Sequence, residues 1–243
     1  EVMTMPIPIH EPVWWGSLLW LIGIAAAAFF VAWLPGTRLR IKRPAYVPIL
    51  LAVTAGLSIG YVAWLGVGVT DVITAHWGWG LLAAVIIPVI LAEPISRRPV
   101  TRHVRGRRLA WEFAWEGGFY GTAEGVLLSA LPPFVTWQMV HALGWSGTPG
   151  AIARWTLPVA AGAAVVLVHH LGYWSCRNMI LLPITLGLSV LSIAFVITGS
   201  WIAPALGHIF MHWELTAHGT EMPPEERPVS QPPGESPPLA RAA

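Results

Sequence analysis

The chain has 243 residues, of which 55% are hydrophobic and only 11% are charged, and its mean hydropathy is +0.63. Because soluble domains carry about 25% charged residues, this composition excludes an ordinary water-soluble domain. The net charge of +2 does not indicate nucleic-acid binding, since residues 38–43 and 97–108 hold ten of the 14 Lys and Arg residues, in loops between apolar segments. The single cysteine, Cys176, excludes an internal disulfide framework and a thiolate metal cluster.

Seven apolar segments follow one another along the chain. A membrane-spanning helix needs about 20 mostly apolar residues, and the last segment is short for a full span. The sequence therefore predicts an all-α, polytopic transmembrane bundle of about seven spans within residues 14–216, after an N-terminal segment at 1–13. The candidate spans are 14–34, 46–67, 74–93, 118–141, 151–173, 179–199 and 201–216.

The basic loops predict how this bundle is oriented. They follow the first and third spans, and cytoplasmic loops carry an excess of Lys and Arg. We therefore expect a multi-pass protein of the cell membrane with its N-terminus outside and its C-terminus in the cytoplasm. Residues 1–13 lack the basic region of a signal peptide, so the first segment is expected to be a true span. Residues 217–243, rich in Pro and Glu, are expected to form a disordered cytoplasmic tail.

Four ionisable residues interrupt the apolar segments: Glu124, His170, His208 and His212. A charged side chain at membrane depth costs ~2.5–3.5 kcal/mol on insertion scales, so such residues usually face a bundle interior and serve a function. With the predicted topology, all four fall in the inner half of the membrane. His208 and His212 are four residues apart and project from one helical face. His169 and His170 are adjacent and diverge by about 100°, so at most one of them points at a given site.

Each of these residues also has a structural interpretation. Glu124 in this setting fits a protonated core carboxyl about as well as a functional one, and a single membrane histidine more often forms a hydrogen bond between helices. The pair His208 and His212 is harder to explain this way, because two buried imidazoles each need a partner. Gly121 and Gly125 flank Glu124 on one helical face and would allow another helix to approach closely.

The order of three segments across residues 111–216 resembles the CPBP family, the CAAX-protease and bacteriocin-processing glutamic intramembrane proteases. That family carries Glu-Glu-x-x-x-Arg on one span, Phe-x-x-x-His on a following span and His-x-x-x-Asn or His-x-x-x-Asp near the end. The matching stretches here are GFYGTAEGVLLSALP, VVLVHHLGYW and GHIFMHW. The family's active site faces the cytoplasm, which agrees with the depth predicted above.

The chain departs from the first of these motifs. Glu124 occupies the position of the family's arginine, and Phe119 and Tyr120 replace the paired glutamates. The catalytic glutamate is therefore matched only if the motif has shifted along the span.

The other two motifs are closer. His170 and His208 match the family's histidines, although Val166 replaces the phenylalanine and His212 replaces the final Asn or Asp. This analogy selects His170 over His169.

The resemblance implies an intramembrane endopeptidase, a hydrolase that would bind a membrane-embedded peptide or protein substrate among membrane lipids. Glu124 would act as the general base that activates water, and His170, His208 and His212 would orient the water or stabilise the oxyanion. A Glu/His set could instead bind a divalent metal, and the sequence does not decide which cofactor, if any, is used.

Two other classes fit the same residues. A redox protein could hold b-type haem between His169 or His170 and His208 or His212, and a Soret band would reveal it. A non-catalytic scaffold, or a carrier of protons or cations, would use Glu124 and the histidines as a polar path. Proton-coupled flux that is lost in Glu124→Gln, in a protein that cleaves no peptide, would favour the carrier.

Overall fold

The computed structural model describes residues 12–97 and 106–218, and all regular structure in these two stretches is helical. The α-helices are α1 (Trp14–Val31), α2 (Arg43–Trp64), α3 (Val69–Thr74), α4 (Trp77–Ser96), α5 (Arg107–Glu112), α6 (Gly121–Glu124), α7 (Leu131–Ala142), α8 (Gly147–Gly172), α9 (Leu181–Thr198) and α10 (Ile202–His218). The wider π-helices are η1 (Ala32–Arg38), η2 (Phe113–Tyr120) and η3 (Gly125–Ala130), and η4 (Trp174–Cys176) is a 3₁₀ turn.

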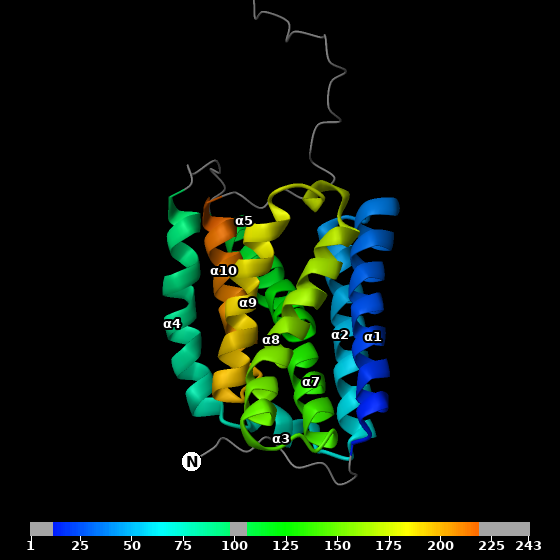
Figure 1. Ribbon diagram of the computed structural model, residues 1–243. Helices are drawn as coiled ribbons and strands as arrows, with labels where there is room; N and C mark the ends of the chain where they lie inside the picture. Colours follow the sequence, from blue (N-terminus) through cyan, green and yellow to red (C-terminus); the bar gives the residue numbers. More distant parts are fainter. Residues whose placement is uncertain (1–11, 98–105, 219–243) are drawn as a thin grey trace, which may run out of the picture.

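The long helices lie side by side in a bundle, with the short α3 at one end (Figure 1). Residues 107–142 form one continuous rod, α5–η2–α6–η3–α7, which we call the central helix. It packs against α1, α2, α8, α9 and α10. Its middle is almost wholly buried: Leu127, Leu128, Leu131 and Phe134 are inaccessible to solvent. The bundle is therefore built around the segment that carries Glu124.

Four helical stretches of the described chain are long and apolar enough to cross a membrane: Trp14–Arg38, Arg43–Trp64, Gly147–Gly172 and Leu181–Thr198. Large apolar side chains point outward along the bundle, such as Leu19 on α1, Val89 on α4 and Leu186 on α9, which are 60%, 72% and 62% exposed. Contiguous exposed apolar surface of this kind marks contact with a membrane or a partner. The all-α expectation is confirmed, and the apolar helices indicate a membrane protein.

The other three expected spans coincide with α4, the central helix and α10. These helices lie alongside the four apolar ones (Figure 1) but are less apolar or shorter. Among the described residues of α4, the stretch Trp77–Leu91 is apolar. The central helix contains the buried Glu112 and Glu124, and α10 has 17 residues with two buried histidines. Within the described residues, long helices thus occur at the seven predicted positions, and four of them have the length and hydropathy of a span.

Prolines account for one of the π-helical stretches beside Glu124. Pro132 and Pro133 open α7, directly after η3. A proline lacks the N–H donor, and its ring clashes with the carbonyl of residue i−4 in an α-helix. The wider winding of η3 moves those carbonyls away from the rings. π-Helical turns are rare and often mark functional sites, and here they flank the four-residue α6 that ends at Glu124.

Two glycines bring α10 against the central helix. A Cβ on Gly121 would lie 2.9 Å from the Cα of Ile209, and one on Gly125 would lie 2.6 Å from the carbonyl oxygen of Pro204. Both distances are too short for any side chain, so only glycine permits this backbone approach. The glycines therefore do what the sequence suggested: they let α10 bring its histidines next to Glu124.

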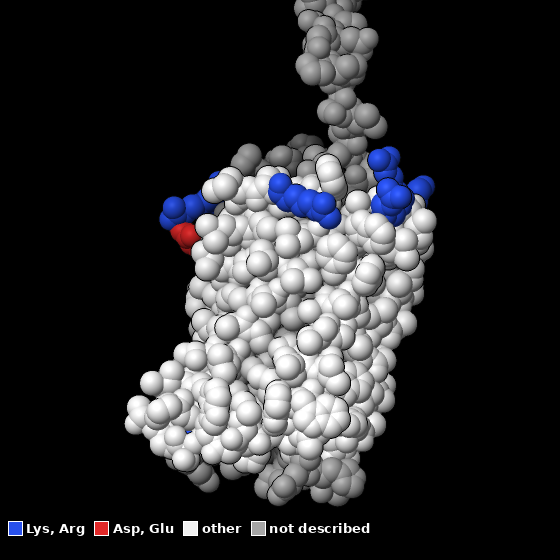
Figure 2. All heavy atoms as spheres, turned by 45° about the vertical axis from the view of Figure 1, so that its right-hand side comes forward, with Lys and Arg blue, Asp and Glu red and all other residues white. Residues whose placement is uncertain are grey.

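Basic side chains collect at one end of the bundle. Figure 2 shows most of the visible Lys and Arg atoms at this end, above a flank largely free of them. The connection from η1 to α2, the end of α4 and the start of α5 all lie there (Figure 1).

Residues 1–11, 98–105 and 219–243 lie outside the described residues. The expectations for most of the N-terminal segment, most of the C-terminal tail and most of the second basic cluster therefore fall outside them too.

A candidate carboxylate–histidine centre

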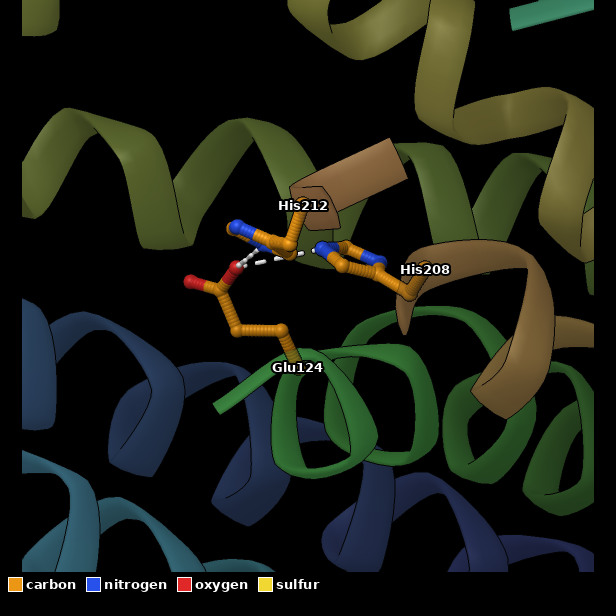
Figure 3. A group of neighbouring side chains, drawn as sticks. All are labelled: Glu124, His208 and His212. Atoms are coloured by element: carbon orange, nitrogen blue, oxygen red, sulfur yellow. Dashed lines mark hydrogen bonds and ion pairs between the residues drawn. The ribbon is translucent and has the colours of Figure 1, made fainter. Parts of the chain in front are cut away.

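Glu124 is the hub of a buried polar cluster. Its side chain is 4% exposed and receives contacts at both carboxylate oxygens. The Tyr120 hydroxyl donates to Oε1 at 2.5 Å, and Nε2 of His169 lies 3.1 Å from the same oxygen. Nε2 of His208 and Nε2 of His212 each lie 3.1 Å from Oε2. Three imidazoles thus surround one carboxylate, two of them visible beside it in Figure 3.

Three helices supply these side chains. Tyr120 and Glu124 are one turn apart on the central helix, so their side chains meet on one face. His208 and His212 are one turn apart on α10, and their rings stack with centroids 4.9 Å apart. The edge of the Tyr120 ring meets the His212 ring, also at 4.9 Å. The close glycine contact between the two helices fixes this arrangement.

The third imidazole is His169 and not His170, which corrects the preference taken from the family motif. His169 is fully buried on α8 between Glu124 and α1. The Nδ1 of His170 instead lies 2.9 Å from the carbonyl oxygen of Val166, one turn back on the same helix. The physical reason is the face of α8: His169 shares its buried side with Gly162 and Val165, and His170 is turned away by one residue.

The hydrogen bonds of His169 fix where its protons lie. Its Nδ1 is 2.8 Å from the backbone carbonyl oxygen of Ala28, which can only accept, so Nδ1 carries a proton. In a neutral imidazole the other nitrogen, Nε2, is then an acceptor, as is the carboxylate of Glu124. A 3.1 Å contact between two acceptors requires either a further proton or another cation. Glu124 and His169 therefore share at least one proton, on either the carboxylate or the imidazole, or a bound cation.

A second layer of polar side chains lies between Glu124 and the basic end of the bundle. The Arg43 guanidinium lies over the Tyr120 ring, 4.7 Å from its centroid, and contacts Glu116 at 3.2 Å. The Tyr46 and Tyr173 hydroxyls are 2.7 Å apart. This layer encloses Tyr120, so its hydroxyl is held in place for Glu124.

The donor set suits a metal ion better than haem. One ligand atom from each of Glu124, His208 and His212 lies within 4.8 Å of the other two. A haem held by histidines of α8 and α10 would have to enter where Glu124 now lies. The backbone contacts at Gly121 and Gly125 leave no space for a macrocycle between α10 and the central helix. The geometry therefore disfavours the haem alternative.

An apolar cavity of about 370 Å³ lies on another face of the central helix. It is bounded by α2, α3, α10 and the stretch of the central helix from Thr122 to Val126, with Ala123 in its wall. Glu124 and the histidines do not line it. The cavity and the centre are thus separated by the central helix and by its glycine contact with α10.

Sequence reasoning missed Tyr120 and preferred His170 to His169, although it named both histidines. Tyr120 precedes Glu124 by four residues, the spacing at which helical side chains meet, so the signal was present. His169 belongs to the series Gly162, Val165 and His169, spaced as one buried helical face. That periodicity identifies the correct histidine, whereas the motif comparison selected its neighbour.

Comparisons of this chain with protein-family models, with curated proteins and with solved structures find no match. Its class therefore follows from the structure. The apolar helices and the buried cluster indicate an all-α membrane protein with a carboxylate–histidine centre inside its helical bundle.

Proposed function

We propose that the chain is an intramembrane hydrolase that cleaves peptide bonds at the centre formed by Glu124, His169, His208 and His212. The observation that carries the proposal is the approach of three imidazole Nε2 atoms to within 3.1 Å of one buried carboxylate. Ionisable groups inside a membrane bundle are costly and usually functional. A carboxylate held by imidazoles is a set that can activate water and stabilise the charge that develops during hydrolysis.

The proposed reaction adds water across a peptide bond. The water oxygen bonds to the carbonyl carbon, the C–N bond breaks, and the second product leaves as an amine after taking up a proton. Without a metal ion, the carboxylate of Glu124 removes a proton from the attacking water as a general base, and the imidazoles of His208 and His212 lie where they can stabilise the oxyanion. If these three side chains held a cation instead, the cation would supply both effects.

The surroundings of the centre favour an apolar substrate from the membrane. Glu124 and its histidines are buried, so a substrate reaches them only if helices separate. The resemblance to the CPBP family points to the same substrate class, a membrane-embedded peptide or protein.

The topology belongs to the same proposal. We infer a multi-pass protein of the cell membrane with about seven spans, its basic end in the cytoplasm and its N-terminus outside. The support is the collection of basic side chains at one end of the bundle (Figure 2), because positive charge is retained on the cytoplasmic side. The centre lies toward that end, since His169 is three residues from the end of α8.

The test is cleavage of a transmembrane peptide by the purified full chain in liposomes made with ¹⁸O-labelled water. Cleavage by the proposed reaction places ¹⁸O in the new carboxyl terminus, as mass spectrometry detects. Glu124→Gln should abolish the product, and His170→Gln, the matched control beside His169, should not. A Glu124→Gln protein that cleaves as fast as the original would overturn the proposal. Proton flux without cleavage would assign the centre to a carrier instead.

A further inference from the structure

His208, His212 and Glu124 meet in a geometry typical of metal ligands. The two imidazoles come from one face of α10, one turn apart, and both direct Nε2 to the same carboxylate oxygen at 3.1 Å. Paired histidines at this helical spacing can reach one metal ion together. One ligand atom from each of the three residues lies within 4.8 Å of the other two, so an ion between them needs only small side-chain adjustments.

We propose that Glu124, His208 and His212 bind a divalent transition-metal ion, with zinc as the ion expected for hydrolysis. Two imidazoles and one carboxylate, with a fourth position left for water, form one of the ligand sets of catalytic zinc. Binding itself does not depend on the proposed function. Only the role of the metal in activating water rests on it.

The contacts around the other carboxylate oxygen support this assignment. Oε1 accepts from Tyr120 and lies beside His169, so Oε2 is the oxygen that faces the two α10 imidazoles. Metal-binding carboxylates are usually held in this way by neighbours that do not themselves bind the ion. Tyr120 and His169 are therefore positioning residues in this proposal, and Glu124, His208 and His212 are the ligands.

The donor atoms of the three residues also limit which metal ion fits. Imidazole nitrogen favours zinc, copper, iron or nickel, whereas calcium and magnesium prefer oxygen ligands. Zinc binds more tightly than ferrous iron to the same donors, which makes it the better first probe. The one cysteine, Cys176, lies in the turn η4 after α8 and is not part of the ligand set, so the site has only N and O ligands.

The experiment measures zinc bound to the full-length chain in detergent. After chelator treatment, the protein is loaded with Zn²⁺, desalted and analysed by elemental mass spectrometry. The original chain should retain one zinc per chain. Glu124→Gln, His208→Gln and His212→Gln should each weaken binding by more than about 100-fold, and Tyr120→Phe and His169→Gln by ~10–100-fold. His170→Gln, outside the cluster, should bind like the original. Cobalt substitution gives a second readout, because its visible absorption reports the ligand geometry directly.

Circular dichroism and gel filtration show whether each variant is folded, and only folded variants count. The metal proposal is overturned if the folded original chain retains no zinc, if the three ligand variants bind like the original, or if His170→Gln loses zinc as they do. Cleavage by the zinc-free chain at full rate would remove the metal's role and leave the hydrolase proposal standing. One bound zinc per chain without any cleavage would support the metal site and overturn the hydrolase proposal.

Discussion

Gly125 offers the most direct test of how the centre is assembled. In Gly125→Ala, the new methyl group would lie 2.6 Å from the carbonyl oxygen of Pro204 and 3.0 Å from Cβ of His208. Non-bonded atoms need about 3.5 Å, so α10 must retreat by roughly 0.9 Å. That movement would stretch the 3.1 Å contact between His208 and Glu124 to about 4 Å, beyond hydrogen-bonding range.

The expected consequences can be measured separately. Overpacking typically costs about 1–3 kcal/mol, which corresponds to a melting temperature lower by roughly 2–12 °C for a chain of this size. Zinc affinity and hydrolysis should fall further, since a misplacement of ~1 Å can cost ~100-fold in rate. The matched control is Gly56→Ala on α2, where an added Cβ has nothing within 4 Å. If Gly125→Ala melts and binds zinc like Gly56→Ala, the glycine contact does not position the histidines.

Two further predictions concern the side chains that hold the carboxylate. Tyr120→Phe removes the donor to Oε1 of Glu124 and should lower the free energy of unfolding by ~1.5–3 kcal/mol. The control Tyr61→Phe loses only a 3.3 Å contact between the hydroxyls of Tyr61 and Ser17 and should lower it by ~0.5–1.5 kcal/mol. Equal losses of stability in thermal unfolding would contradict the special role of Tyr120. His169→Gln should reduce peptide cleavage by about tenfold or more, because His169 holds Oε1 of Glu124 in place, while His170→Gln should leave it unchanged. A larger loss of cleavage in His170→Gln than in His169→Gln would favour His170, the histidine that the family motif selects.

The hydrophobic pattern predicted most of the fold because lipid and helix geometry act on long stretches of chain. In the part of the chain that the structure describes, a long helix occurs at each of the seven predicted apolar segments. What the pattern could not give was the winding of the central helix, whose π-helical turns depend on local steric conflict, as at Pro132 and Pro133. It also could not show that α4 packs extensively against α10, since helix order in a bundle depends on contacts between distant segments.

The centre was partly predictable for a similar reason. Glu124, His208 and His212 stand out because polar groups are rare in apolar segments, and the structure brings these three together. The choice between His169 and His170 required knowing which face of α8 is buried. Tyr120 was overlooked because a tyrosine is not unusual in a membrane segment, and only its spacing from Glu124 reveals its role.

The π-helical stretches on either side of Glu124 also determine which changes in length this chain can accept. A π turn contains one residue more than an α turn, so deleting one residue from η3 would leave a continuous, ordinary helix. Because the wider π turn already accommodates that extra residue, its loss would leave Phe134 and the rest of α7 facing about the same way relative to Glu124. Related chains that differ by one residue here would therefore keep both their helices and the side chains that face the centre. A single gap at this place would signal neither altered chemistry nor a broken fold.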